Sequence, residues 1–128
     1  MHKLISILLL FVSLQGFTQT KIYKSLATEN HSSFQIEWIE REITFSDSLI
    51  SIKTITDSTT DIQEFLVIDS GEDEFLEVGM CKYYKCSSPD GKAISTFFIP
   101  ITEKVERIEA LVPYLPGEKP KHFRFHID

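Results

Sequence analysis

The two cysteines are the residues whose chemistry would matter most to the stability of the chain. Cys81 and Cys86 are five residues apart, and Lys82–Lys85 between them include no turn former. Along an extended strand this spacing covers about 16 Å, whereas the Cα atoms joined by a disulfide lie roughly 4.4–6.8 Å apart. Odd spacing also sends the two side chains to opposite faces of a strand. We therefore expect two unpaired thiols, with Cys86 in the core, rather than a Cys81–Cys86 disulfide.

Two histidines near the end of the chain, His122 and His126, are four residues apart. On a helix this spacing would bring two metal ligands together. On a strand the two side chains share a face but stand about 13 Å apart, which is too far for one ion. A metal site would need His31 or carboxylates from another strand. We interpret the pair as part of a solvated polar face, and predict neither a metal site nor a cofactor.

Carboxylates cluster at two places without matching a functional motif. The first is an acidic segment that we expect to form a turn, and its spacing differs from that of the calcium-binding D-x-[DN]-x-[DN]-G loop. The second could supply a pair for acid–base chemistry, but nothing marks its members as buried. The two groups are Asp69, Glu72, Asp73 and Glu74, and Glu37, Glu40 and Glu42. The sequence also has no G-x-S-x-G motif, no cysteine near a histidine and no glycine-rich phosphate loop. We therefore predict that the protein is not an enzyme.

The first eighteen residues have the layout of a secretory signal peptide. Lys3 provides a basic start, Leu4–Leu14 contain no charge, and Gly16 and Thr18 place small residues before a cleavage site. The apolar run is too short to span a bilayer, and no second run follows it. We expect residues 1–18 to be cleaved and the mature chain, which has no membrane span, to be exported to the periplasm or the medium.

The charge of the mature chain limits its class of partner. Removing Lys3 with the leader leaves twelve basic and nineteen acidic residues, a net charge of −7. Since DNA, RNA and anionic membranes require a basic surface, this balance argues against all three. A small ligand or another protein is the expected partner.

The elements that must position these residues are short strands. Phe34, Ile36 and Trp38 alternate with polar residues, which predicts a strand with one buried face. The apolar positions then change parity, which predicts a bulge near Glu40–Glu42. Residues 19–33 have weak periodicity and are expected to form a loose N-terminal segment.

Further strands follow at regular spacing to the end of the chain. We predict that residues 34–128 form a single all-β domain, an antiparallel meander of seven or eight strands folded as a barrel or a sandwich. Residues 102–112 fit a helix or a strand, and Pro113 after them favours the strand.

The clearest local signal is the turn Ser88–Gly91, which predicts a hairpin. Pairing Ser88 with Lys92 across it gives the two strands one shared apolar face. This inner face would hold Met80, Tyr84, Cys86, Ile94 and Phe98. The outer face would then hold Tyr83, Phe97 and Ile99.

A leader followed by such a meander, with Trp38 on its first predicted strand, resembles the small secreted lipocalin-like (calycin-like) barrels. The resemblance implies an apolar pocket at a barrel mouth. We expect non-enzymatic binding of a small apolar ligand, with Trp38, Tyr84 and Phe98 lining the cavity. The alternative is an interaction or inhibitor module that works through its outer surface, and a hydrolase comes third.

Overall fold

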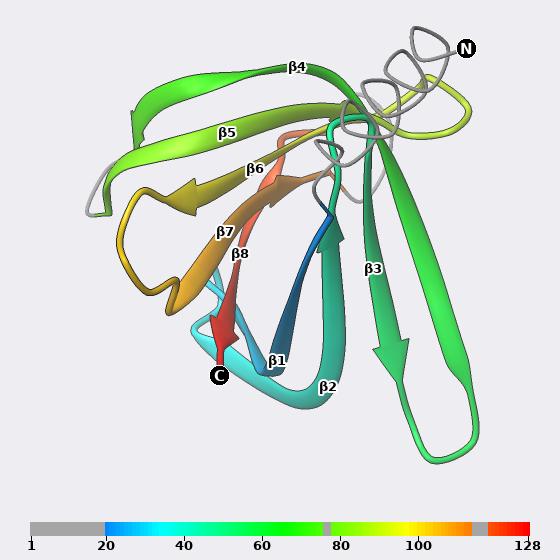
Figure 1. Cartoon of the computed structure of the whole chain (residues 1–128). Helices are drawn as coiled ribbons and strands as arrows, with labels where there is room; N and C mark the ends of the chain where they lie inside the picture. Colours follow the sequence, from blue (N-terminus) through cyan, green and yellow to red (C-terminus); the bar gives the residue numbers. More distant parts are fainter. Residues whose placement is uncertain (1–19, 76–77, 114–117) are drawn as a thin grey trace, which may run out of the picture.

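Eight antiparallel strands form a closed barrel in this computed structural model, which describes residues 20–75, 78–113 and 118–128 (Figure 1). The predicted leader lies outside these residues. Each strand pairs with the next in sequence, and β8 pairs with β1 to close the barrel. The strands are β1 (Lys21–Asn30), β2 (Gln35–Phe45), β3 (Leu49–Ile55), β4 (Thr60–Phe75), β5 (Gly79–Ser87), β6 (Ile94–Pro100), β7 (Arg107–Val112) and β8 (Lys121–Ile127).

The predicted all-β antiparallel meander is confirmed, and the barrel rather than the sandwich is observed. The ambiguous segment 102–112 contains strand β7, all of which pairs with β8. The alternating apolar residues of this segment thus belong to a strand, and Pro113 follows directly after Val112, the last residue of β7. In the part of the chain that the structure describes, no helix is long and apolar enough to cross a bilayer.

Residues 21–30, which we expected in a loose N-terminal segment, form strand β1 instead. β1 lies between β2 and β8, and its register shifts between Ser25 and Ala27 against both neighbours. Ser25 and Thr28 are both buried, although Thr28 lies an odd number of positions, three, after Ser25 along the strand. The shift changes which positions face inward, so it hides the period of two by which a strand is recognised in a sequence.

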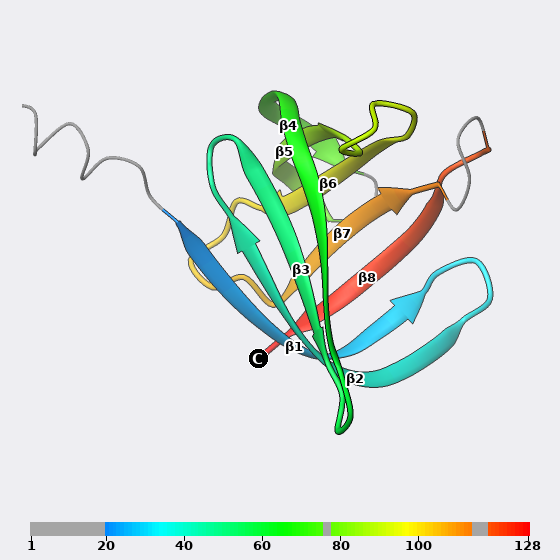
Figure 2. The same ribbon diagram turned by 90° about the vertical axis from the view of Figure 1, so that its right-hand side faces the viewer.

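A bulge in β2 lies close to the expected place. Ser25 pairs with Arg41, and the next pair is Ala27 with Trp38. Between these pairs β1 has one residue, whereas β2 has two, Ile39 and Glu40. An extra residue bends a strand and increases its twist. The ladder with β3 begins only at Glu40, so the preceding stretch, Gln35–Trp38, pairs with β1 alone. As a result the β1–β2 hairpin extends away from β3 and β4 (Figure 2).

The barrel interior is filled by aliphatic and aromatic side chains from seven of the eight strands. Phe97 lies at its centre with no exposed surface, and its ring packs 5.0 Å from Phe65 and 6.1 Å from Phe45, centroid to centroid. Such edge-to-face contacts add to the free energy gained by burying the rings. The buried core consists of Ile43, Phe45, Ile50, Ile52, Phe65, Tyr84, Cys86, Phe97, Ile99, Ile108, Ala110 and Phe125.

The hairpin of β5 and β6 forms where predicted, but its register is one residue off. Ser88 pairs with Ala93 rather than with Lys92, because its backbone N–H donates to the Ala93 carbonyl at 2.8 Å. Asp90 stabilises the longer loop by accepting hydrogen bonds from the Ser88 hydroxyl and the Lys92 N–H. Gly91 supplies the left-handed residue, with φ of 76°.

This slip of one residue inverts the faces of β6. Tyr84 lies opposite Phe97 and Cys86 opposite Ser95. Phe97 and Ile99 are therefore in the core, and the prediction that they face outward is wrong. For this reason Ile94 and Phe98 do not belong to the buried core. Met80 shares the parity of Tyr84 and Cys86, but it lies near the start of β5 and is 52% exposed.

Candidate functional site

A cavity of about 920 Å³ opens at the end of the barrel that carries the β1–β2, β3–β4 and β7–β8 connections. We call it the mouth pocket. Its lining residues are Thr28, Asn30, Gln35, Ile36, Glu37, Arg41, Ile52, Thr54, Asp61, Gln63, Phe65, Val112, Pro113, Phe123 and Phe125. Eight of these fifteen residues are polar, so the pocket is amphipathic rather than purely apolar.

The apolar part of the mouth pocket is continuous with the core. Ile52, Phe65 and Phe125 are each less than a tenth exposed and also belong to the core cluster. Phe123 and Val112, half-buried, extend the same surface along β8 and β7. This floor can receive an apolar group, and the flat aromatic rings favour stacking or edge contacts.

Arg41 forms the polar wall. Its Nη1 donates to Thr28 Oγ1 at 2.6 Å, and its Nε donates to Thr54 Oγ1 at 3.2 Å. Its Nη2 lies 2.7 Å from Glu37 Oε1. The Arg41 side chain is only 17% exposed, whereas that of Glu37 is 62% exposed. The two threonines come from neighbouring strands and fix the guanidinium in the wall, while its carboxylate partner sits at the solvated rim.

The three residues predicted to line a cavity do not lie in the mouth pocket. Trp38 is 79% exposed, because it points to the opposite face of β2 from Glu37 and Arg41. Phe98 is half-buried on the outer face, as a result of the register slip. Tyr84 is buried, but it lines a separate cavity of about 360 Å³ at the other end of the barrel.

Arg41 and its threonine partners were missed by sequence reasoning. The signal was present for Arg41, because it shares the parity of Ile43 and Phe45, both of which are buried in the core. A cation on the inward face of a strand is uncommon and marks a pocket or an ion pair. The threonines carried no comparable signal, since their role depends on the pairing of separate strands.

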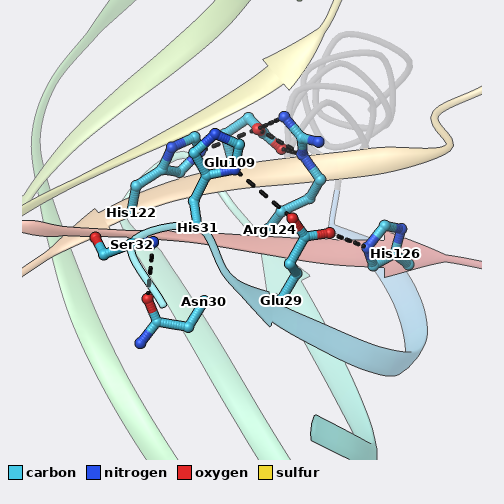
Figure 3. A network of polar contacts seen from close by, with 8 residues as sticks. All are labelled: Glu29, Asn30, His31, Ser32, Glu109, His122, Arg124 and His126. Atoms are coloured by element: carbon cyan, nitrogen blue, oxygen red, sulfur yellow. Dashed lines mark hydrogen bonds and ion pairs between the residues drawn. The ribbon is translucent and has the colours of Figure 1, made fainter. Parts of the chain in front are cut away.

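A second polar cluster lies on the outer face of β1, β7 and β8 (Figure 3). At its centre Glu109 has no exposed surface. Arg124 Nε donates to both carboxylate oxygens of Glu109 at 2.8 and 3.0 Å, and Arg124 Nη2 lies 2.8 Å from Oε1. His122 Nε2 lies 3.0 Å from the same oxygen. Phe75 covers this group, with its ring 4.5 Å from that of Phe98 and 5.4 Å from that of His122.

Glu29 joins the other two histidines to this cluster. Its Oε1 lies 3.2 Å from His126 Nε2, and its Oε2 lies 3.7 Å from His31 Nδ1. The rings of His31 and His122 are 4.5 Å apart. We call Glu29, His31, Glu109, His122, Arg124 and His126 the outer network.

The outer network corrects the prediction of a solvated polar face. His122 and His126 do share a face, but both are partly buried against carboxylates from β7 and β1. Arg124 lies between them along β8, and a cation at this centre opposes the binding of a second one. Within residues 20–75, 78–113 and 118–128, no group of three or more histidine, cysteine or acidic side chains is arranged to hold a metal ion.

Cys81 and Cys86 are free and fully buried on opposite faces of β5. Burial raises the pKa of the Cys86 thiol to about 12. Burial also raises the pKa of the Cys81 thiol, and the nearby Glu109 carboxylate adds to the increase. Since the thiolate is the reactive form, both groups are inert at neutral pH.

These two thiols give a direct measure of folding. At roughly pH 8, where a free thiol is substantially ionised, we expect native protein to leave Ellman's reagent unreduced. In guanidinium chloride both cysteines should react. A rapid reaction of either thiol in the native protein would contradict its buried position.

Comparisons with protein-family models, with curated proteins and with solved structures give no match for this chain. The arguments for function therefore come from the geometry of the mouth pocket and the outer network.

Proposed function

We propose that this protein is an exported, lipocalin-like binding module that holds one small amphipathic molecule in the mouth pocket. The observation that carries the proposal is the pairing of an apolar floor with a fixed, largely buried Arg41. A volume of about 920 Å³ falls within the range of pockets that enclose small ligands. Export rests on the predicted leader, residues 1–18.

The lining of the mouth pocket supports the binding of a molecule with two chemically different ends. An apolar body would lie against Phe65 and Phe125, with its polar head towards Arg41. Three of the five guanidinium N–H groups donate to the partners described above, which leaves two for a ligand acceptor. The sequence led us to expect a small apolar ligand. We now propose a ligand that has an apolar body and also carries a polar or acidic head.

Binding without chemistry is the activity that this lining supports best. The described lining residues include no histidine, cysteine or serine, so they offer none of the usual nucleophile–base pairs. Glu37 and Asp61 contribute carboxylates, and the first of them is already paired with Arg41. Native mass spectrometry of the purified protein tests the proposal directly. A bound molecule at one copy per chain is the expected result.

Replacing Arg41 with methionine should weaken binding of an aromatic anion. Anilinonaphthalene sulfonate is a suitable probe, because its rings fit the apolar floor and its sulfonate can accept from Arg41. A hydrogen bond to a charged group contributes about 1.5–3 kcal/mol, so the dissociation constant should rise by roughly ten- to a hundredfold. Fluorescence titration measures it.

The matched control is Lys53→Met, which removes a positive charge from β3 outside the mouth pocket. Its dissociation constant should stay at the wild-type value. Equal affinities of the Arg41→Met variant and the wild type would show that the probe does not bind at the mouth pocket.

A further inference from the structure

The barrel closes over only part of β2. Glu40–Phe45 pair with β3, whereas Gln35–Trp38 pair with β1 alone. All residues of the second stretch are exposed. Among the described residues, no strand pairs with the edge of Gln35–Trp38 that lies opposite β1. The backbone N–H and C=O groups on that edge therefore belong to no ladder. We call Gln35–Trp38 the open edge.

The open edge also carries exposed apolar side chains. Trp38 and the preceding Phe34 are each 79% exposed, the highest value among large apolar residues in the described part of the chain, and Ile36 is 48% exposed. Natural proteins usually protect a free edge with charged side chains, proline, a bulge or a very short strand. The open edge is short, but residues 34–38 contain neither lysine nor proline, and their one charged residue, Glu37, is paired with Arg41. An edge of this kind favours pairing with another strand.

We propose that two copies of this chain pair through their open edges, as an antiparallel ladder with its two-fold axis at Ile36. The pairing would continue the sheet from one barrel into the other. An interface of this type is isologous, because the same patch serves on both copies.

The side chains select this register. With the axis at Ile36, the two Ile36 side chains face each other, and Gln35 lies opposite the second copy's Glu37. Phe34, which precedes β2 and has a φ of 57°, would lie near the second copy's Trp38. Apolar groups then meet apolar groups, and an amide meets a carboxylate.

Neighbouring registers are less favourable. An axis at Glu37 would place two carboxylates opposite each other, and like charges at such positions are destabilising. An axis at Trp38 would place Ile36 opposite the acidic Glu40. If the axis lay between two residues instead of at one, each residue would lie opposite a residue of the other face. The outer face of one strand would then continue into the inner face of the other.

The open edge also borders the mouth pocket, because Gln35, Ile36 and Glu37 line both. A second copy would therefore add its own strand to the rim of the pocket. The pairing does not depend on a ligand, so it can be tested on its own.

Site-directed crosslinking tests the register. Directly opposed residues of an antiparallel pair have Cα atoms about 4.5–5.5 Å apart, which suits a disulfide. Ile36→Cys should therefore form a disulfide-linked dimer under mild oxidation. Ile62→Cys is the matched control, because Ile62 is 60% exposed on β4 but lies outside the open edge. It should stay monomeric on a non-reducing gel.

Sedimentation velocity tests the association itself. The wild type should sediment as a dimer, Ile36→Lys as a monomer, and Ile62→Lys as a dimer. Protection of the buried thiols from Ellman's reagent shows that each variant is folded. A monomeric wild type, or equal crosslinking through Ile36→Cys and Ile62→Cys, would overturn the proposal while leaving ligand binding in the mouth pocket unaffected.

Discussion

An Arg124→Leu variant is expected to lose about 3–5 kcal/mol of unfolding free energy. The loss follows from Glu109, which has no exposed surface and receives three short contacts from the Arg124 guanidinium. Without Arg124 this carboxylate keeps only His122 as a partner within the outer network. Leaving a charge buried without its counter-ion costs far more than the intact pair contributes. Urea unfolding followed by circular dichroism measures the change.

The double variant Glu109→Leu/Arg124→Leu separates the cost of an unpaired buried carboxylate from the stability that the intact ion pair contributes. Removing both charges abolishes the unpaired carboxylate, so most of the lost stability should return. Arg107→Leu is the matched single control, because Arg107 lies on the same face of β7 without contacting Glu109 in an ion pair. It should change stability by no more than about 0.5 kcal/mol. A loss below about 1 kcal/mol for Arg124→Leu would contradict a charged, buried Glu109.

A Phe97→Ala variant is the second change with a large expected effect, again about 3–5 kcal/mol. The Phe97 ring is fully buried and packs against the rings of both Phe45 and Phe65. Truncation removes this apolar surface and leaves a cavity that the surrounding strands cannot fill. Circular dichroism is the suitable probe, because Trp38 is mostly exposed and its fluorescence would respond weakly to unfolding.

Phe98→Ala is the control for the same experiment and also tests the register of β6. Phe98 is half-buried on the outer face against Phe75, so its loss should cost about 1 kcal/mol. If Phe98→Ala proved more damaging than Phe97→Ala, the loop between β5 and β6 would be one residue shorter than observed, and the faces of β6 would be reversed.

The strand type and most of the strands could be predicted because apolar alternation and turn residues are local signals. Strand β1 was missed, and the acidic residues 69–74, which we expected in a turn, belong to β4. The faces of β6 could not, because both sets of its side chains are apolar and therefore fit either face. The loop length decided between them, and Pro89-Asp90-Gly91 is compatible with both lengths. A slip of one residue then reverses every side chain of the strand.

The sites were harder to predict than the strands. Alternation showed that Trp38 and Glu37 lie on opposite faces of β2. In this stretch, which precedes the part of β2 that pairs with β3, the apolar Trp38 points outward and the polar Glu37 lines the mouth pocket. For the outer network, the sequence placed His122, Arg124 and His126 on one face. Their acidic partners come from β1 and β7, and pairing between such distant segments leaves no local trace.

The length of β4 has a consequence for how this fold can change. Phe65 near its start lies in the barrel core, while Phe75 at its end covers the outer network. The register of β4 with β5 shifts between Val67 and Asp69, which leaves Ile68 as an extra residue. That residue moves the later odd-numbered positions from the inner to the outer face. Deleting Ile68 would turn Phe75 inward and uncover Glu109, so the buried ion pair on the outer face depends on this single extra residue.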